Sequence, residues 1–126
     1  MLAELLLATL LASAGPVAVD GVYPNPATPE DRGEFVLLSV PENATTEGLV
    51  LTDGEGRIDL SGLDASGLVA VTDDPGPASE LTDATVHRTE SFLSLSNAGE
   101  AVRLETPAGT STVTYPRAPT GELYRD

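Results

Sequence analysis

Beyond residue 16 the chain alternates short apolar runs with clusters of Gly, Pro, Asn and Asp, a pattern typical of strands joined by tight turns. No stretch in this region repeats at helical spacing. The predicted strands are Val17–Tyr23, Glu34–Val40, Leu49–Thr52, Arg57–Leu60, Leu68–Thr72, Ala84–Val86, Phe92–Leu95, Ala101–Glu105 and Thr110–Tyr115. About seven to nine short strands separated by turns predict an all-β fold, either a β-sandwich or a barrel.

Three turns can be recognised from their residues. Asp53–Gly56 can supply the positive-φ positions of a hairpin, Asn97–Gly99 does the same before Glu100, and Pro107–Gly109 closes the last strand pair.

Alternation along two strands predicts how they are buried. In Glu34–Val40 one face presents Val36, Leu38 and Val40 and the other presents Phe35 and Leu37, so we expect both faces of this strand to be buried. In Ala101–Glu105, Val102 and Leu104 should point inward while Arg103 and Glu105 face water, as in a sheet covered on one side.

Composition excludes several function classes. The 126 residues hold 20 Asp and Glu against six basic residues, all arginine, which gives a net charge of −14. Direct nucleic-acid binding is not expected, because it needs a cationic surface that replaces counterions. The absence of cysteine excludes disulfides and thiolate chemistry, and a single histidine excludes two-histidine sites.

The lack of lysine beside 20 carboxylates predicts adaptation to high salt. A folded chain of this mass exposes roughly 6,300 Å², which leaves a mean spacing near ~21 Å between excess charges. Such charges repel one another in dilute buffer but not in molar salt, where the screening length is ~3 Å. The alternative is an acidic secreted domain without special salt adaptation.

Residues 1–14 resemble an export signal. An apolar run, Leu5–Ala12, is too short to span a bilayer and ends in the small-x-small pattern Ala12-Ser13-Ala14. We therefore expect export to the extracellular space or cell surface, and no transmembrane helix in the mature chain. Glu4 stands where such signals usually carry a basic residue, so a misplaced start codon and a short buried helix remain alternatives.

Four segments in order resemble a lamin-tail domain over residues 17–116. They are Val22–Pro26, Asp31–Val36, Leu49–Gly54 and Leu93–Leu104. The resemblance implies an immunoglobulin-like β-sandwich that serves as an interaction module. In microbes such modules are often exported and joined to nucleases or phospholipase-D-like hydrolases.

The sequence offers no convincing catalytic or cofactor-binding residues. His87 is alone, and phosphodiester transfer of the phospholipase-D type needs a histidine together with a lysine that this chain lacks. Ser91, His87 and an aspartate could formally make a triad, but no nucleophile elbow surrounds the serine. We predict that the chain is not an enzyme and needs no cofactor.

No dedicated metal site is expected either. Asp53, Glu55, Asp59 and Asp64 fail the calcium-loop template because Arg57 occupies a ligand position and Ile58 the position of the glycine. The acidic segment Asp73–Pro77 is predicted to be a solvated loop that caps a strand. Loose cation association with so negative a surface is expected.

Two final features complete the predictions. Asn43-Ala44-Thr45 matches the N-glycosylation acceptor pattern, which makes Asn43 a candidate modification site, and residues 117–126 are predicted to be a tail or linker.

The favoured function is a non-enzymatic, exported module of a halophile that binds an unknown protein or cell-surface ligand. The alternative is the N-terminal accessory domain of an exported phospholipase-D-like hydrolase or nuclease whose catalytic part lies outside this chain.

Overall fold

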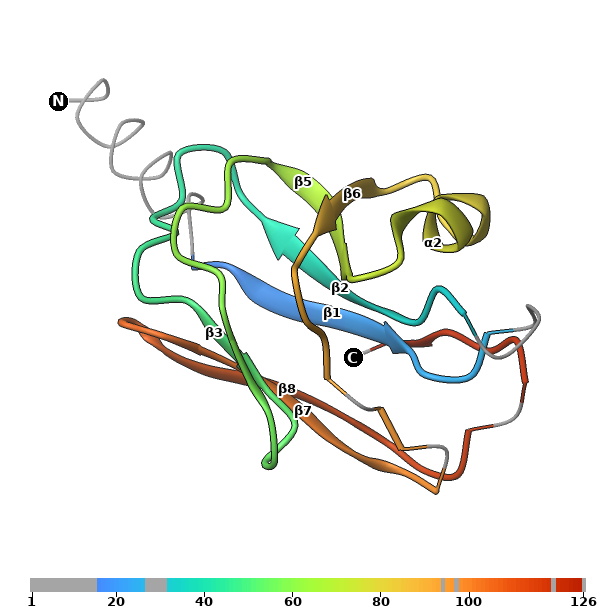
Figure 1. Ribbon diagram of the computed structural model, residues 1–126. Coiled ribbons are helices and arrows are strands. Elements are labelled where there is room, and N and C mark those ends of the chain that lie inside the picture. Colours follow the sequence, from blue (N-terminus) through green and yellow to red (C-terminus); the bar gives the residue numbers. More distant parts are fainter. Residues whose placement is uncertain (1–15, 27–31, 94, 97, 119, 126) are drawn as a thin grey trace, which may run out of the picture.

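The chain folds as a β-sandwich, which confirms the predicted all-β class (Figure 1). The computed structural model describes residues 16–26, 32–93, 95–96, 98–118 and 120–125. Its strands are β1 (Ala18–Tyr23), β2 (Phe35–Val40), β3 (Val50–Thr52), β4 (Arg57–Asp59), β5 (Gly67–Thr72), β6 (Thr85–Arg88), β7 (Glu100–Thr106), β8 (Gly109–Tyr115) and β9 (Tyr124–Arg125). One helix, α2 (Pro75–Leu81), lies between β5 and β6. The predicted export signal, residues 1–14, lies outside the described residues.

The strands form two sheets that enclose the main core. Sheet A has the order β6-β5-β2-β1-β9 and sheet B the order β4-β3-β7-β8. All pairs are antiparallel except β5 and β6, which run parallel. The core side chains between the sheets are aliphatic apart from Tyr115, and they include Val22, Val36, Leu38, Leu49, Leu51, Val69, Val71, Val102, Leu104 and Val113.

Burial along β2 and β7 agrees with the alternation in the sequence. Val36, Leu38 and Val40 of β2 join the core between the sheets, whereas Phe35 and Leu37 belong to a second cluster on the outer face of sheet A. Both faces of β2 are therefore buried, as predicted. In β7, Val102 and Leu104 are fully buried and Arg103 is exposed.

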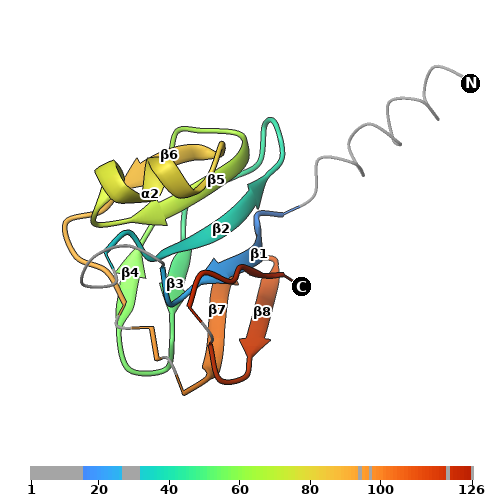
Figure 2. The same ribbon diagram turned by 90° about the vertical axis from the view of Figure 1, so that its right-hand side faces the viewer.

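Helix α2 covers the outer face of sheet A, and the sequence analysis missed it. Its Ala78 is buried against Phe35, Leu37 and Ala70, and Figure 2 shows the helix lying on that face. The prediction of a solvated acidic loop at Asp73–Pro77 is therefore wrong in part, because the helix begins at Pro75. A proline fits the first turn of a helix, where its missing N–H has no intrahelical partner.

The side chain of Asp74 is used for an ion pair and not for capping this helix. Asp74 occupies the N-cap position, yet its carboxylate accepts two hydrogen bonds from Arg32, at 2.9 and 3.1 Å, and makes no cap hydrogen bond. The pair ties the start of α2 to the segment that enters β2. A local acidic turn in the sequence thus joins two distant parts of sheet A.

Two further segments differ from the predictions. The described residues of Phe92–Leu95 are not a strand: Leu93 and Leu95 are buried as part of the irregular connection from β6 to β7. The segment predicted as a tail or linker folds back onto the sandwich, because β9 pairs with β1 through Gly21↔Arg125 and Val22↔Tyr124. Burial therefore accounts for the apolar residues Leu93 and Leu95 without a strand.

Hydrogen bonds anchor the returning C-terminal segment. Asn25 donates from Nδ2 to the carbonyl of Ala118 at 2.8 Å, and the amide of Gly121 donates to the carbonyl of Asn25 at 2.7 Å. Ala118 is itself buried. Asn25 therefore ties the segment after β1 to the returning C-terminal segment.

Candidate functional site

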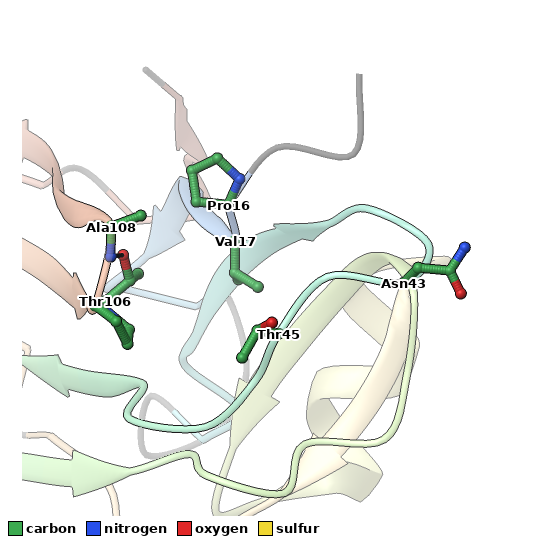
Figure 3. Close-up of a pocket in the computed structure, with 7 residues that line it drawn as sticks. Pro16, Val17, Asn43, Thr45, Thr106 and Ala108 are labelled. Atoms are coloured by element: carbon green, nitrogen blue, oxygen red, sulfur yellow. Dashed lines mark hydrogen bonds between the residues drawn. The ribbon is translucent and has the colours of Figure 1, made fainter. Parts of the chain in front are cut away.

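A hollow of about 360 Å³ lies at one end of the sandwich, where three separate segments meet (Figure 3). We call it the loop-end groove, and its lining residues are Pro16, Val17, Asn43, Thr45, Thr106, Pro107 and Ala108. They come from the start of β1, the loop between β2 and β3, and the turn between β7 and β8. Most of the lining is proline, alanine, valine and threonine, so the groove offers apolar and hydroxyl-bearing surface.

Local hydrogen bonds fix two of the three walls. In the β7–β8 turn, the Thr106 hydroxyl donates to the carbonyl of Gly109 at 2.9 Å and accepts from the amide of Ala108 at 3.1 Å. In the β2–β3 loop, the amide of Ala44 donates to the carbonyl of Pro41 at 3.1 Å. These short-range bonds shape the β7–β8 turn and the β2–β3 loop.

Asn43, the candidate glycosylation residue, stands at the rim of this groove. It is exposed and has a φ of 63°, a left-handed conformation that asparagine tolerates better than most residues. Figure 3 shows its amide pointing away from the other labelled residues. A glycan at this position would project outward from the groove, but its attachment remains a prediction.

A second hollow, of about 320 Å³, contains the single histidine, and we call it the His87 cleft. Its lining residues are Arg57, Ile58, Asp59, His87, Arg88, Thr89, Glu90 and Ser91. His87 and Arg88 lie within β6, whereas the strand predicted from the sequence ended before them, at Val86. The cleft lies between this edge strand of sheet A and β4, the edge strand of sheet B.

The formal serine triad is not assembled in this cleft. His87, Ser91 and Asp59 all line it, yet no hydrogen bond joins any two of these side chains in the described part of the chain. The Asp59 carboxylate accepts the amide N–H of Ser61 at 2.8 Å, and hydrogen bonding to the backbone and side chain of Ser61 lowers the pKa of Asp59. Nucleophilic catalysis needs the base in contact with the hydroxyl, so the arrangement lacks its essential contact.

The acidic residues considered as metal ligands are dispersed among turns. Asp53 uses Oδ1 to accept the amides of Glu55 and Gly56, at 2.9 and 2.7 Å, which shapes the β3–β4 hairpin. Asp59 binds the Ser61 amide. Among the described residues, no group of three or more His, Asp and Glu could hold a metal ion.

One half-buried polar network lies beside the start of β7. The Tyr115 hydroxyl donates to the carbonyl of Ser96 at 2.7 Å and to Oε1 of Glu100 at 3.2 Å, and the Ser96 amide donates to the same Oε1 at 3.0 Å. Burial raises the pKa of Glu100, and the Ser96 and Tyr115 hydrogen bonds act in the opposite direction. Burial and the neighbouring Glu100 also raise the pKa of Tyr115. The network closes the Ser96–Glu100 turn onto the end of β8.

An apolar hollow on sheet A was also missed by the sequence analysis. It measures about 400 Å³, and its lining includes Leu37, Leu68 and Leu123. Leu68 and Leu123 are the exposed large hydrophobic residues of the described chain, at 43% and 38% exposure. The sequence did not place Leu123 on this surface, because residues 117–126 were predicted to be a tail or linker and the pairing of β9 with β1 was not foreseen.

Comparison with protein-family models, curated proteins and solved structures returns no match for this chain. Within the residues that the structure covers, no helix has the length and hydropathy of a membrane span. The resemblance to lamin-tail domains therefore stays a prediction from the sequence.

Proposed function

We propose that this protein is a non-enzymatic interaction module, exported by a halophile, that binds a protein or cell-surface ligand through the loop-end groove. The observation that carries the proposal is the convergence of three sequence-distant segments on one open hollow with an apolar and hydroxyl lining. Loops held by a rigid sandwich are the usual position of binding residues in all-β domains.

The uncharged lining of the groove favours a ligand that is recognised through apolar contacts and hydroxyl hydrogen bonds, not through ion pairs. None of the residues that line the groove is charged, although the whole chain has a net charge of −14. Apolar contacts and hydroxyl hydrogen bonds lose little strength in molar salt, whereas screening weakens contacts between exposed charges. An uncharged groove on an acidic domain thus suits binding in concentrated salt.

The test measures binding of the full chain to envelopes prepared from the cells that produce it, in 2 M NaCl. Ala108→Arg places a long charged side chain in the groove, leaves the Asn43-Ala44-Thr45 pattern intact and should weaken binding at least tenfold. Ser79→Arg adds the same charge on the exposed face of α2, away from the groove, and should leave binding unchanged.

Three outcomes would contradict the proposal. Binding could fail to saturate, the two variants could weaken it equally, or the wild-type chain could hydrolyse phosphodiester, ester or peptide substrates in the same buffer. In the last case, loss of activity in His87→Ala would place the chemistry in the His87 cleft.

A further inference from the structure

The outer face of sheet B, unlike that of sheet A, carries no helix of the described residues. Figures 1 and 2 show α2 on sheet A and no helix of the described chain over sheet B. Strand alternation and register assign the outward positions of this face, which we call the sheet B face: Val50, Thr52, Arg57, Asp59, Ala101, Arg103, Glu105, Thr110, Thr112 and Thr114. Small side chains on β8 make one side of the face flat.

The face is electrically balanced in a strongly acidic protein. It holds two of the six arginines, Arg57 and Arg103, and two carboxylates, Asp59 and Glu105. Its formal charge is therefore zero, and the whole net charge of −14 lies elsewhere in the chain. The face therefore adds no net charge repulsion when two copies approach through it.

The charges on the face form two rows that cross the strands. Asp59 and Glu105 both pair with Val50 of β3 and make an acidic row. Arg57 and Arg103 both pair with Thr52 and make a basic row. Because the rows are two residues apart along each strand, they are separated by about 7 Å.

This pattern is complementary to itself. A two-fold axis in the plane of the face, perpendicular to the strands and midway between the rows, places the acidic row of one copy over the basic row of the other. Arg103 then faces Glu105 of the second copy, and Arg57 faces Asp59. We infer that the sheet B face is a self-association surface at which two copies of the chain form a symmetric dimer.

The existing contacts leave the face ready for this arrangement. Arg57 donates to Oε1 of Glu105 at 2.8 Å across β3, so both side chains are already extended over the sheet. Arg103 has no hydrogen bond or ion pair with another described residue, and its side chain is exposed. The face covers on the order of 400 Å² per copy, below the roughly 800 Å² of stable complexes, so the dimer should dissociate on dilution.

This surface is separate from the loop-end groove, so the inference does not depend on the proposed function. Analytical ultracentrifugation of the full chain tests it from about 10 µM to 1 mM in about 0.15 M NaCl, where contacts between facing charges are screened less than in molar salt. The weight-average mass should rise with concentration towards that of a dimer. Arg103→Glu should weaken association at least tenfold, because each copy then presents carboxylates to carboxylates.

A double variant that restores opposite charges at the facing positions separates charge pairing from a general loss of association. In Arg103→Glu/Glu105→Arg the two rows exchange sign at β7, so the facing pairs are again opposite in charge and association should return to within about threefold of wild type. Arg117→Glu makes the same charge change as Arg103→Glu outside the face and should associate normally.

The inference is overturned if the wild type stays monomeric at 1 mM, if Arg103→Glu associates as well as wild type, or if the folded double variant remains monomeric. Circular dichroism establishes that each variant is folded. Should Arg103→Glu be unfolded, Thr112→Asp takes its place, because it puts a carboxylate in the basic row and should weaken association in the same way.

Discussion

Removing the hydroxyl of Tyr115 should destabilise the domain in a pH-dependent way. The ring is 2% exposed and packs in the core, so Tyr115→Phe preserves the packing and deletes only the donor to Ser96 and Glu100. An acceptor deprived of its partner costs roughly 1–3 kcal/mol when fully buried. Because water reaches half-buried Ser96 and Glu100, we expect a loss of about 1–2 kcal/mol at pH 7.

The sign of the pH dependence follows from Glu100. Burial places its folded-state pKa above the unfolded value, so ionisation of Glu100 costs folding free energy. That cost is absent below the unfolded pKa and complete once the pH has risen through the folded pKa. The Tyr115 hydrogen bond favours the ionised form, so its loss raises the folded pKa further, and the cost of Tyr115→Phe should shrink as pH falls from 7 towards 4.

Urea unfolding in 2 M NaCl at several pH values measures both quantities. Tyr124→Phe is the matched control, since its hydroxyl contacts the Arg117 carbonyl and Glu122 at 3.2 Å on the surface and should cost less than about 0.5 kcal/mol. A loss below about 0.5 kcal/mol for Tyr115→Phe at pH 7, or one that is independent of pH, would refute the reasoning.

Three other predictions concern salt, backbone geometry and modification. The melting temperature at pH 7 should rise steadily from 0.01 to 2 M NaCl, and equal stability at both ends would contradict halophilic adaptation. Gly99→Ala should lower the free energy of unfolding by about 2–4 kcal/mol in urea melts, because φ is +102° and a Cβ would lie 2.9 Å from the Tyr115 carbonyl oxygen. Gly62→Ala is the control: its φ is +86° but a Cβ would meet open space, so the loss should be only about 1–2 kcal/mol. Mass spectrometry of native protein should find a start after Ala14 and a glycan on Asn43; an intact residue 1–11 segment or unmodified Asn43 would contradict the respective prediction.

The strands could be predicted because their signals are local. The hairpin at Asp53–Gly56 depends on a turn whose carboxylate binds its own amides, and Gly54 has the positive φ that the sequence indicated. The burial of β2 on both faces followed from its apolar run Phe35–Leu38 and from Val40. In these cases the residues that determine the structure are adjacent in the chain.

The missed elements depend on contacts between distant residues. Helix α2 contains two prolines and a glycine in seven residues, so its helix propensity is poor, and burial of Ala78 against Phe35 and Leu37 stabilises it. Strand β9 has only two residues, and its pairing depends on Gly21, where a Cβ would come within 2.7 Å of the Tyr124 carbonyl oxygen. Neither stabilising contact can be identified from the local sequence.

The candidate sites divide in the same way. Asn43 was identified from a tripeptide pattern, and the structure places it in an exposed loop. The groove beside it could not be predicted, since Val17, Thr45 and Thr106 are ordinary residues that become neighbours only when the ends of three strands meet. The sheet B face likewise requires the register between β3, β4 and β7 before its charges form rows.

Hydrogen exchange of the envelope-bound domain tests most directly whether the loop-end groove is the binding site. With the full chain in 2 M NaCl, binding should slow exchange at the amides of residues 43–46 and 108, which line or adjoin the groove, while exchange in α2 stays as in the free protein. Slower exchange confined to α2, to the sheet B face or to the His87 cleft, with the groove unchanged, would contradict the proposed mode of binding.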